Sequence, residues 1–313
     1  MEVRRYESSD AETWNAFLKQ AFNASFLFDR GYMDYHSDRF SDFSLMIFAN
    51  DELVAVMAGN SEGDNWFSHG GLTYGGIVMK KAMSQRVVIQ CLDTVQQFLK
   101  GEGFKTITYK ALPQVYYDKF YQNLEYGLFN HGYECFRRDA STSIVLSDRA
   151  KVPKGRKAAI KKAAKQGVTV KETDELSAFF VIQDANIKKK YDATTVHTVE
   201  EMRLLKDRFP NNIRLYVAEY EGETVAGGLV YLNKGVMHLQ YFAMNEKGEQ
   251  VSATDLVIDH VLKCCVEEGI KIFDFGISTE EGGRYLNEGL NKYKESFGGV
   301  TTLYEFYKLT LHE

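Results

Sequence analysis

Two stretches of the chain follow the same plan and decide the fold. Residues 45–76 read LMIFANDELVAVMAGNSEGDNWFSHGGLTYGG, and residues 215–248 read LYVAEYEGETVAGGLVYLNKGVMHLQYFAMNEKG. Each predicts a strand, a tight turn, a second strand, another turn and a third strand. The first turn holds Asn50-Asp51 in one stretch and Glu221-Gly222 in the other, and Asn, Asp and Gly are typical of hairpin turns.

The correspondence continues beyond the third strand. Residues 85–100 and 253–267 carry apolar side chains at helical spacing, and a glycine follows each of these predicted helices. Short apolar strands come next, at 106–109 and 272–275, and each copy then predicts a second helix and a terminal strand. A helix joining neighbouring strands implies a right-handed parallel connection, whereas hairpins make antiparallel pairs. The sequence therefore predicts an α/β (α+β mixed) chain of two tandem domains, each a mixed, mostly antiparallel sheet with helices on both faces.

Composition limits the classes of protein that fit. The chain has 313 residues, a net charge of −5 and three prolines, values that fit a globular protein of two domains. The four cysteines form no CxxC pair, so we expect free thiols in a reducing compartment. No apolar run reaches the length of a membrane span, and no secretory signal is recognisable. These features favour a cytoplasmic protein.

A strongly basic segment separates the two copies. Residues 149–171 hold nine basic side chains and no acid, and the pattern at 154–166 predicts a helix. The expected division is therefore an N-terminal domain at 1–148, a basic connector helix at 149–171 and a C-terminal domain at 172–313. The connector is interpreted either as a solvated linker or as an anion site for a small phosphorylated or nucleotide-linked substrate. The residues expected to bind that substrate are Lys154, Arg156 and Lys157. Binding of tRNA usually needs a wide basic surface and aromatic side chains that stack on bases. The sequence shows neither clearly, but it does not exclude tRNA as a partner.

Three short motifs give the chain a family resemblance. They are TYGG at 73–76, FDFG at 273–276 and GLNKYKESFGG at 289–299, the last being the most specific. With the repeated plan, they resemble the tandem GNAT-fold, FemAB-like (BioF2-like) acyltransferase family. The resemblance implies an N-acyltransferase that moves an acyl or aminoacyl group from a CoA-type or tRNA donor to an amine of a cell-envelope or nucleotide-linked precursor. It also implies that the first domain binds the acceptor and that the second domain binds the donor.

Candidate catalytic residues lie in the second copy. Asp274 ends an apolar strand between two phenylalanines, and a carboxylate buried there suits a general base; the alternative is a carboxylate that only bonds the next loop. The resemblance implies that a tyrosine after this strand protonates the leaving group, so Tyr285 is the candidate acid and Tyr293 a candidate substrate contact. The alternative is that both are core aromatics. Lys294 precedes a Gly-Gly pair and is a candidate to polarise the carbonyl or hold a phosphate; otherwise it is a solvated lysine.

The expected donor-phosphate site is the start of the helix at 253–267. GNAT proteins hold a pyrophosphate at such a helix start, which is an anion site because its N–H groups are unpaired. The residues expected there for an acyl-CoA are Gln250, Val251, Ser252, Ala253 and Thr254. The match is degraded, because Glu249 and Asp255 oppose an anion. An ordinary capped helix start is the alternative, and it opens a third possibility for the whole chain: a non-catalytic binding protein with the same fold.

The first copy is expected to shape the acceptor cleft. A glycine-rich run at 70–76 suits close backbone approach, and strands diverge near the end of 106–110. The candidate substrate contacts here are Tyr74, Gly75, Gly76, Tyr109, Lys110 and Tyr116. No metal-ligand spacing is present among the histidines, so no metal is expected. The sequence does not specify an oligomeric state.

Overall fold

The computed structural model describes residues 1–117 and 119–311 and divides the chain into two compact units. The first unit contains residues 1–140, 279–286 and the described residues from 302 onward, and the second contains 141–278 and 287–301. Both units are therefore discontinuous in sequence, whereas the division expected from the sequence is continuous. The basic connector helix belongs to the second unit. Among the described residues, no helix combines the length and apolar character that crossing a bilayer requires.

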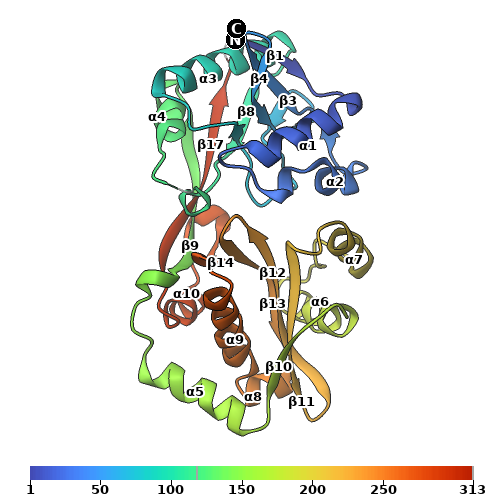
Figure 1. Cartoon of the computed structure of the whole chain (residues 1–313), viewed down its shortest axis with the longest axis vertical. Coiled ribbons are helices and arrows are strands. Elements are labelled where there is room, and N and C mark those ends of the chain that lie inside the picture. The colour runs from blue at the N-terminus through green and yellow to red at the C-terminus, as the bar shows by residue number, and fades with distance from the viewer. Residues whose placement is uncertain (118, 312–313) are drawn as a thin grey trace. The chain divides into compact units, whose positions relative to one another are not determined.

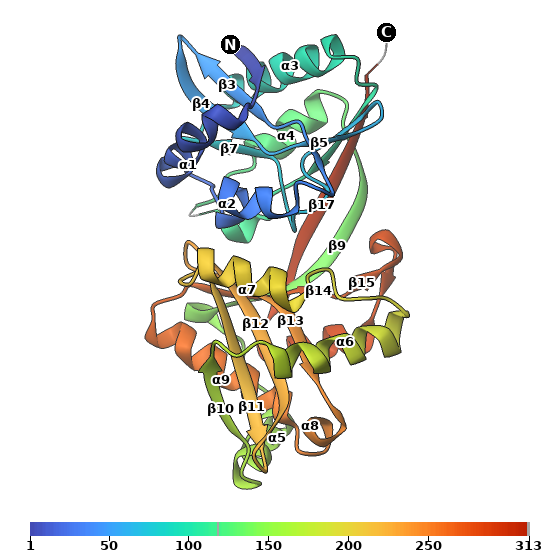
Figure 2. The same ribbon diagram turned by 90° about the vertical axis from the view of Figure 1, so that its right-hand side faces the viewer.

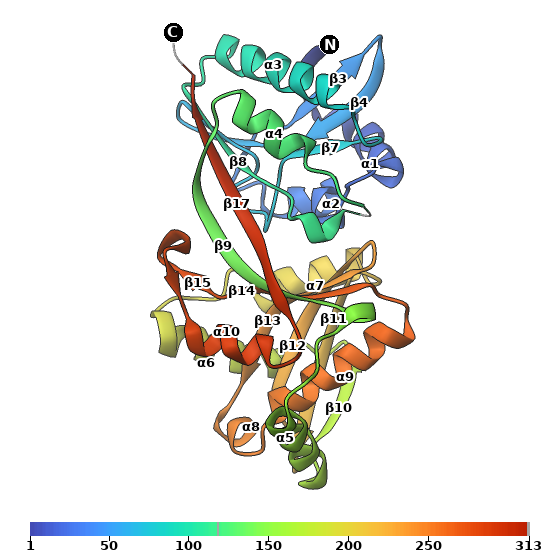
Figure 3. The ribbon, with the colours of Figure 1, turned by 90° about the vertical axis from the view of Figure 1, so that its left-hand side faces the viewer.

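The first unit contains two sheets flanked by helices and a separate two-stranded sheet of β15 and β16. Its strands are β1 (Glu2–Arg5), β2 (Ser41–Asp42), β3 (Leu45–Ala49), β4 (Glu52–Met57), β5 (Asn60–Glu62), β6 (Asn65–Phe67), β7 (Ile77–Met79), β8 (Thr106–Lys110), β15 (Thr279–Glu280), β16 (Tyr285–Leu286) and the end of β17 (Val300–Thr310). One sheet has the order β1-β3-β4-β7, and the other runs β17-β8-β6-β5-β2. The helices are α1 (Ala11–Gln20), α2 (Arg30–Met33), α3 (Gln85–Gly101) and α4 (Asn123–Asn130), with α1 and α2 on the opposite side of the strands from α3 and α4 (Figures 1 and 3).

The second unit is built on one twisted sheet of the order β10-β11-β12-β13-β14-β9. Its strands are the end of β9 (Glu134–Val145), β10 (Thr169–Thr173), β11 (Ile213–Tyr220), β12 (Glu223–Asn233), β13 (Val236–Met244) and β14 (Ile272–Ile277). Its helices are α5 (Lys154–Lys165), α6 (Ser177–Tyr191), α7 (Val199–Arg208), α8 (Glu246–Gln250), α9 (Ala253–Glu267) and α10 (Glu288–Glu295). Figure 2 shows α6 and α7 in front of one face, and Figure 3 shows α9 and α10 in front of the other.

Both hairpins predicted from the sequence are present. Asn50 and Asp51 have φ of 51° and 63°, and Glu221 and Gly222 have φ of 53° and 79°. Two successive positive φ values are the requirement of the type I′ turn, whose twist matches that of the strands it joins. The residue types at these turns therefore account for the pairing of β3 with β4 and of β11 with β12.

The repeated order of hairpin, helix, strand, helix and terminal strand is confirmed, with one difference. In the first copy the strand that pairs with the hairpin, β7, begins at Ile77, just after the quoted stretch, and the short β5–β6 hairpin is inserted before it. The terminal strands also pair across the repeats. β9, which ends the first copy, pairs with β14, and β17, which ends the second copy, pairs with β8. The predicted mixed fold with helices on both faces is confirmed.

The core of the second unit lies between its sheet and α9. The fully buried side chains Val257, Val261, Val230 and Phe273 belong to one apolar cluster, and Phe297 beyond α10 joins it. Burying apolar surface is worth about 25 cal/mol per Å². This cluster therefore makes α9 and the start of β14 a rigid support for the residues at the end of β14.

Candidate active site

The backbone of the second unit opens where two neighbouring strands part. β13 and β14 pair in parallel only from Val236–His238 to Ile272–Asp274, although both strands continue further. β13 also carries a bulge, since Leu229 faces Tyr241 while Val230 faces Leu239, which leaves Gln240 as the extra residue. We call the point beyond His238 and Asp274 the fork. Strands that part in this way leave peptide groups available to a ligand.

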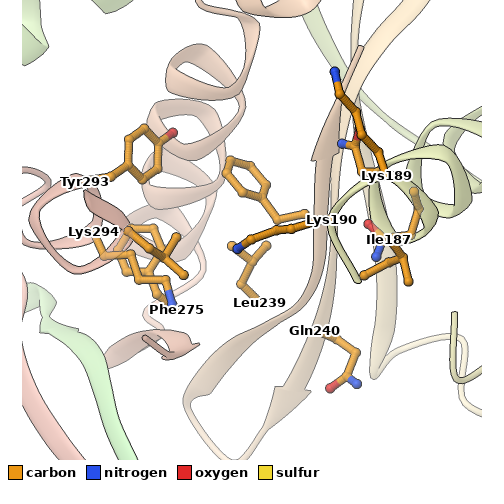
Figure 4. Close-up of a pocket in the computed structure, with 12 residues that line it drawn as sticks. Ile187, Lys189, Lys190, Leu239, Gln240, Phe275, Tyr293 and Lys294 are labelled. Carbon is orange, nitrogen blue, oxygen red and sulfur yellow. The ribbon is translucent and has the colours of Figure 1, made fainter. Parts of the chain in front are cut away.

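A cavity of about 650 Å³ opens at the fork. Its lining comes from α6 on one face of the sheet and from α10 on the other, with β13 and β14 between them (Figure 4). The lining residues are Gln183, Asn186, Ile187, Lys189, Lys190, Leu239, Gln240, Phe242, Phe275, Leu290, Tyr293 and Lys294. The apolar members suit the hydrocarbon part of a ligand.

The charge of the cavity has one sign. Three of the lining residues are lysines, Lys189, Lys190 and Lys294, and no acidic side chain lines it among the described residues. The side-chain oxygens of Gln183 and Gln240 are buried and have no hydrogen-bond partner within the described part of the chain. The cavity therefore combines cationic groups for an anionic atom with amide oxygens that can accept from a ligand N–H.

Lys294 reaches the fork from α10 and is held there by backbone oxygens. Its Nζ donates to the carbonyl oxygen of Gly276 at 2.9 Å and to that of Ile277 at 2.6 Å. Burial lowers the pKa of Lys294 to about 8; Lys190 lowers it further, and Asp274 opposes the shift. An ammonium has three N–H groups, so two bonds to the protein leave a third for a ligand. The structure thus brings Lys294 into the cavity, as its candidate role requires.

Asp274 is fully buried and acts as the centre of a hydrogen-bond network. Its Oδ1 accepts from Ser141 Oγ at 2.7 Å and from Ser143 Oγ at 3.0 Å, both on β9, and Oδ2 accepts from His238 Nδ1 at 2.8 Å. Asp274 does not line the cavity. The carboxylate is close enough to Lys294 to raise its pKa, but its three side-chain donors enclose it. Its role as the base itself stays a prediction.

His238 is the residue that sequence reasoning missed. It lies directly opposite Asp274 in the parallel register of β13 and β14, and 7% of its surface is exposed. A histidine alone in an apolar strand carries no signal of function. The signal appears only when the register of the two strands is known, because that register brings the imidazole to the carboxylate.

The expected phosphate site at the start of α9 is covered by a side chain. Arg156 of α5 forms an ion pair with Asp255, donates from Nε to Ser296 Oγ at 2.8 Å and stacks on the rings of Tyr293 and Phe297. Asp255 is itself buried in the first turn of α9. Arg156 therefore neutralises Asp255 and occupies the space over this helix terminus.

The five residues expected to bind a donor phosphate form the turn between α8 and α9. Ser252 is the N-cap of α9 with a positive φ of 56° and no side-chain capping bond. Val251, Ala253 and Thr254 are buried, and Gln250 ends α8. The structure thus places Gln250, Val251, Ser252, Ala253 and Thr254 beside the Arg156–Asp255 pair.

The remaining candidates of the second half fall in different surroundings. Tyr293 lines the cavity, and burial raises the pKa of its hydroxyl. Lys154 and Lys157 are exposed on α5. On the same helix, Ala163 is buried and Ala164 is exposed. Tyr285 is exposed on β16, in the first unit, and is therefore not in the same compact unit as Lys294.

The first-copy candidates pack around the glycine-rich run. Gly76 has a φ of 91°, and a Cβ there would lie 2.5 Å from Tyr109 Oη, so only glycine fits. Tyr109 accepts from the Ile77 N–H at 3.1 Å. The Nζ of Lys110 donates to the carbonyl oxygens of Gly70 and Leu72, and burial lowers the pKa of this lysine to about 8.

Hydrogen bonds made by their hydroxyl groups hold two of the tyrosines of this group in place. The Tyr74 hydroxyl bonds Ser25 Oγ at 3.1 Å, the Tyr116 hydroxyl bonds that of Tyr304 at 3.2 Å, and a Cβ on Gly75 would strike the Ser68 carbonyl. The structure thus brings Tyr74, Gly75, Gly76, Tyr109, Lys110 and Tyr116 together as a buried support for residues 70–76.

Comparisons with known proteins agree with this geometry. Residues 150–295 match the family described as Acetyltransferase (GNAT) domain. A crystal structure of FemX is 12% identical, with a TM-score of 0.70 over 99% of this chain and 98% of that one. Residues 150–295 therefore carry a GNAT acetyltransferase domain, and the whole chain shares the fold of FemX.

Two further structures share the fold of this chain. The C-terminal domain of a putative lysylphosphatidylglycerol synthetase from Agrobacterium fabrum is 12% identical, with a TM-score of 0.65 over 98% of this chain and 93% of that one. A tandem GNAT protein from the clavulanic acid biosynthesis pathway is 12% identical, with a TM-score of 0.52 over 100% and 99% of the two chains. No curated protein matches the sequence.

The comparisons also support the enzyme class. The acetyltransferase family model covers the cavity lining, α9 and all of α10, so the expectation of a GNAT-type acyltransferase is supported for this part of the chain. Within the described residues, no group of three or more His, Cys, Asp or Glu side chains is arranged to hold a metal ion.

Proposed function

We propose that this tandem GNAT protein is an N-acyltransferase whose donor acyl group lies in the cavity at the fork. The observation that carries the proposal is the position of Lys294. Its ammonium is held at the parted strands, inside a cavity whose charged lining residues are all lysines. A fixed donor aimed at a carbonyl oxygen stabilises the negative charge that develops when an amine attacks. Lys294 is the group proposed to provide that stabilisation.

Acyl transfer also needs the two reactants to be positioned. The apolar wall of Leu239, Phe242 and Phe275 suits the body of the donor, and Tyr293 closes the cavity on the α10 side. Excluding water from such a site strengthens the bond from Lys294 to the carbonyl oxygen. Tyr285 remains the proposed acid for the leaving group, and Asp274 remains part of the proposed proton-accepting machinery.

The donor is proposed to be an acyl or aminoacyl carrier. For acyl-CoA, the turn at 250–254 is the proposed phosphate site, but a pyrophosphate there must displace Asp255 from Arg156. Breaking a largely buried ion pair costs several kcal/mol. This observation favours a second candidate, transfer of an aminoacyl group from tRNA, which does not need that helix terminus.

Other features support the aminoacyl candidate. Lys157, Lys161 and Lys165 of α5 are exposed and can face a phosphate backbone. The unpaired amide oxygens of Gln183 and Gln240 suit the α-amino group of an aminoacyl ester. The name of the lysylphosphatidylglycerol synthetase relative also states an aminoacyl product.

The acceptor is proposed to be an amine of a cell-envelope or nucleotide-linked precursor, held by the first half of the chain. The buried contacts of Tyr74, Tyr109 and Lys110 support the backbone of 70–76, which is the proposed acceptor contact, and Tyr116 steadies the same region. Lys154, Lys157 and the α5 surface are proposed to hold a phosphate of the substrate. CoA, tRNA and nucleotide-linked precursors place the reaction in the cytoplasm in this proposal.

A binding screen tests the proposal. A ligand that binds the native state raises the unfolding midpoint by mass action. The screen uses acetyl-CoA, longer acyl-CoAs, UDP-sugars and aminoacyl-tRNA, with wild-type protein and Lys294→Met. We expect one donor class to raise the midpoint of the wild type, and we expect Lys294→Met to lose acyl transfer by about 100-fold or more from that donor. If none of these compounds binds, the non-catalytic alternative replaces the enzyme.

A further inference from the structure

We propose that His238 accepts the proton of the attacking amine through Nε2, and that Asp274 is a positioning residue that fixes the imidazole. This inference rests on the proposed function of the fork cavity. It differs from the sequence-based expectation, in which Asp274 is the base. Three features carry it: the contacts of the two residues, the glycine between His238 and Lys294, and the charges of the cavity.

The hydrogen bonds of Asp274 determine the tautomer of His238. Asp274 receives hydrogen bonds from two serine hydroxyls on β9 and from His238 Nδ1. A carboxylate that is surrounded by donors is the ionised acceptor, so Nδ1 carries the hydrogen. The lone pair of the neutral ring is then on Nε2. A base oriented by a buried carboxylate in this way is a recurring arrangement in proton transfer.

Gly276 leaves space in front of Nε2. This residue has a φ of 74°, a left-handed conformation that favours glycine. A Cβ at this position would lie 3.3 Å from His238 Cε1 and 4.0 Å from Nε2. A side chain here would crowd the Cε1 edge of the imidazole. Conformation and space therefore both favour glycine beside His238.

The same glycine lies between His238 and Lys294; His238 itself is next to the cavity lining rather than part of it. The carbonyl oxygen of Gly276 accepts a hydrogen bond from Lys294, so His238 and Lys294 approach the same residue from two sides. The neighbours of the pair, Leu239 and Phe275, line the cavity. The other charged groups at this end are the enclosed Asp274 and three cations, namely Lys189, Lys190 and Lys294. Among the described residues at the fork, His238 is therefore the group that we assign as proton acceptor.

The transfer step balances with these groups. The amine nitrogen attacks the acyl carbon and forms the N–C bond, while the carbonyl electron pair moves to the oxygen beside Lys294. The nitrogen gives one proton to His238 Nε2, and Asp274 stabilises the imidazolium. The bond from carbon to the donor oxygen or sulfur then breaks with its electron pair. That leaving atom takes the proton from His238 Nε2, and the imidazole returns to its neutral form, so in this step His238 replaces Tyr285 as the acid.

The first test uses the wild-type protein without substrate. Diethyl pyrocarbonate acylates an accessible imidazole nitrogen that holds a lone pair, and peptide mass mapping identifies the modified histidine. We expect His238 to be modified, and we expect ¹⁵N NMR of labelled protein to show hydrogen on Nδ1 and none on Nε2. Hydrogen on Nε2, or an unreactive His238 in protein whose other histidines react, overturns the inference.

The second test uses His238→Asn and Asp274→Asn. Asparagine keeps a donor near the Nδ1 position, so His238→Asn retains the bond to Asp274 and lacks Nε2. With the donor that binds in the thermal screen, we expect unchanged donor binding and a loss of transfer of about 100-fold or more. In Asp274→Asn, the ¹⁵N signals should show a mixed tautomer, which a purely structural role does not predict.

The outcomes separate the two proposals. If Lys294→Met loses transfer and His238→Asn keeps it, the inference about His238 is wrong and the acyltransferase proposal stands. If wild-type protein binds none of the donors, the proposed function fails, while the tautomer and reactivity of His238 still report on the geometry of the fork.

Discussion

The Nζ of Lys294 lies 2.9 Å from the carbonyl oxygen of Gly276, at the point where β14 has left β13. A second bond, to Ile277, ties the same ammonium to the next carbonyl along the strand. Both residues lie beyond the last pair of β14 with β13, so Lys294 bonds β14 on the side where β13 has parted from it. Lys294 therefore holds the backbone at the fork and is also the group proposed to polarise the carbonyl. Its positive charge lies in a buried site that disfavours the charged form.

The first prediction concerns that disfavoured charge. Because the folded-state pKa of Lys294 is about 8 and the unfolded value about 10.5, the unfolded chain binds more protons between these values. The free energy of unfolding therefore rises with pH in this window. From pH 8 to 9 we expect the wild type to gain about 1 kcal/mol more than Lys294→Met, measured by urea unfolding. Lys292→Met, an exposed change on the same helix, is the control and should keep the wild-type slope.

The second prediction concerns the contact between α5 and α9. Arg156→Ala leaves the buried carboxylate of Asp255 without its cation, so we expect unfolding to become easier by about 2–4 kcal/mol. The exposed neighbour variant Lys157→Ala should change the unfolding free energy by less than about 0.5 kcal/mol. Adding Asp255→Asn to Arg156→Ala should restore part of the loss. A double variant as unstable as the sum of its parts would mean that the two residues are not coupled.

The sequence predicts the local structure of this chain well. Asn50-Asp51 and Glu221-Gly222 are residue pairs that type I′ turns select, and the apolar spacing at 85–100 leaves one buried face for α3. These signals are local, so neighbouring residues suffice to interpret them. The three motifs are local as well: residues 73–76 directly precede β7, residues 273–276 lie within β14, and residues 289–299 include the end of α10.

The partnerships between distant segments could not be predicted. Ser143 faces Asp274 across 131 positions of chain, and the sequence has no local signal for a terminal strand that pairs with the other copy. For the same reason His238 was missed and Arg156 was expected to face a ligand. Whether Arg156 contacts a phosphate or Asp255 depends on how α5 packs on α9, which no spacing within α5 reveals.

The third prediction concerns two stacked imidazoles in the first unit. His69 and His36 have ring centroids 5.2 Å apart, and burial, followed by His36, Lys110 and Arg30, lowers the pKa of His69 to about 3. Below pH 6.5 the unfolded chain takes up the proton and the folded chain does not, so stability falls as the pH drops from 6.5 towards 3.

The variant His69→Asn tests this sensitivity. Asparagine tolerates the φ of 61° at this position and does not titrate. Between about pH 6.5 and 4.5 we expect the wild type to lose about 2 kcal/mol more of its unfolding free energy than the variant does. Equal losses in both proteins would contradict the assignment of this acid sensitivity to His69.

The last prediction tests the surface of α5 as a phosphate contact. Lys157, Lys161 and Lys165 are exposed and make no ion pair within the described residues, so their replacement by alanine should leave the fold intact. Each phosphate contact releases condensed counterions, and the logarithm of tRNA affinity falls with the logarithm of salt by about 0.7–0.9 per contact. The triple alanine variant should therefore bind tRNA more weakly and lower this salt slope by about two to three. A matched variant with alanine at three exposed lysines of the first unit, Lys19, Lys100 and Lys308, should keep the wild-type slope. If the salt slope of tRNA binding is the same in all three proteins, the lysines of α5 do not contact phosphates. The tRNA-dependent candidate would then lose the support that it draws from this helix.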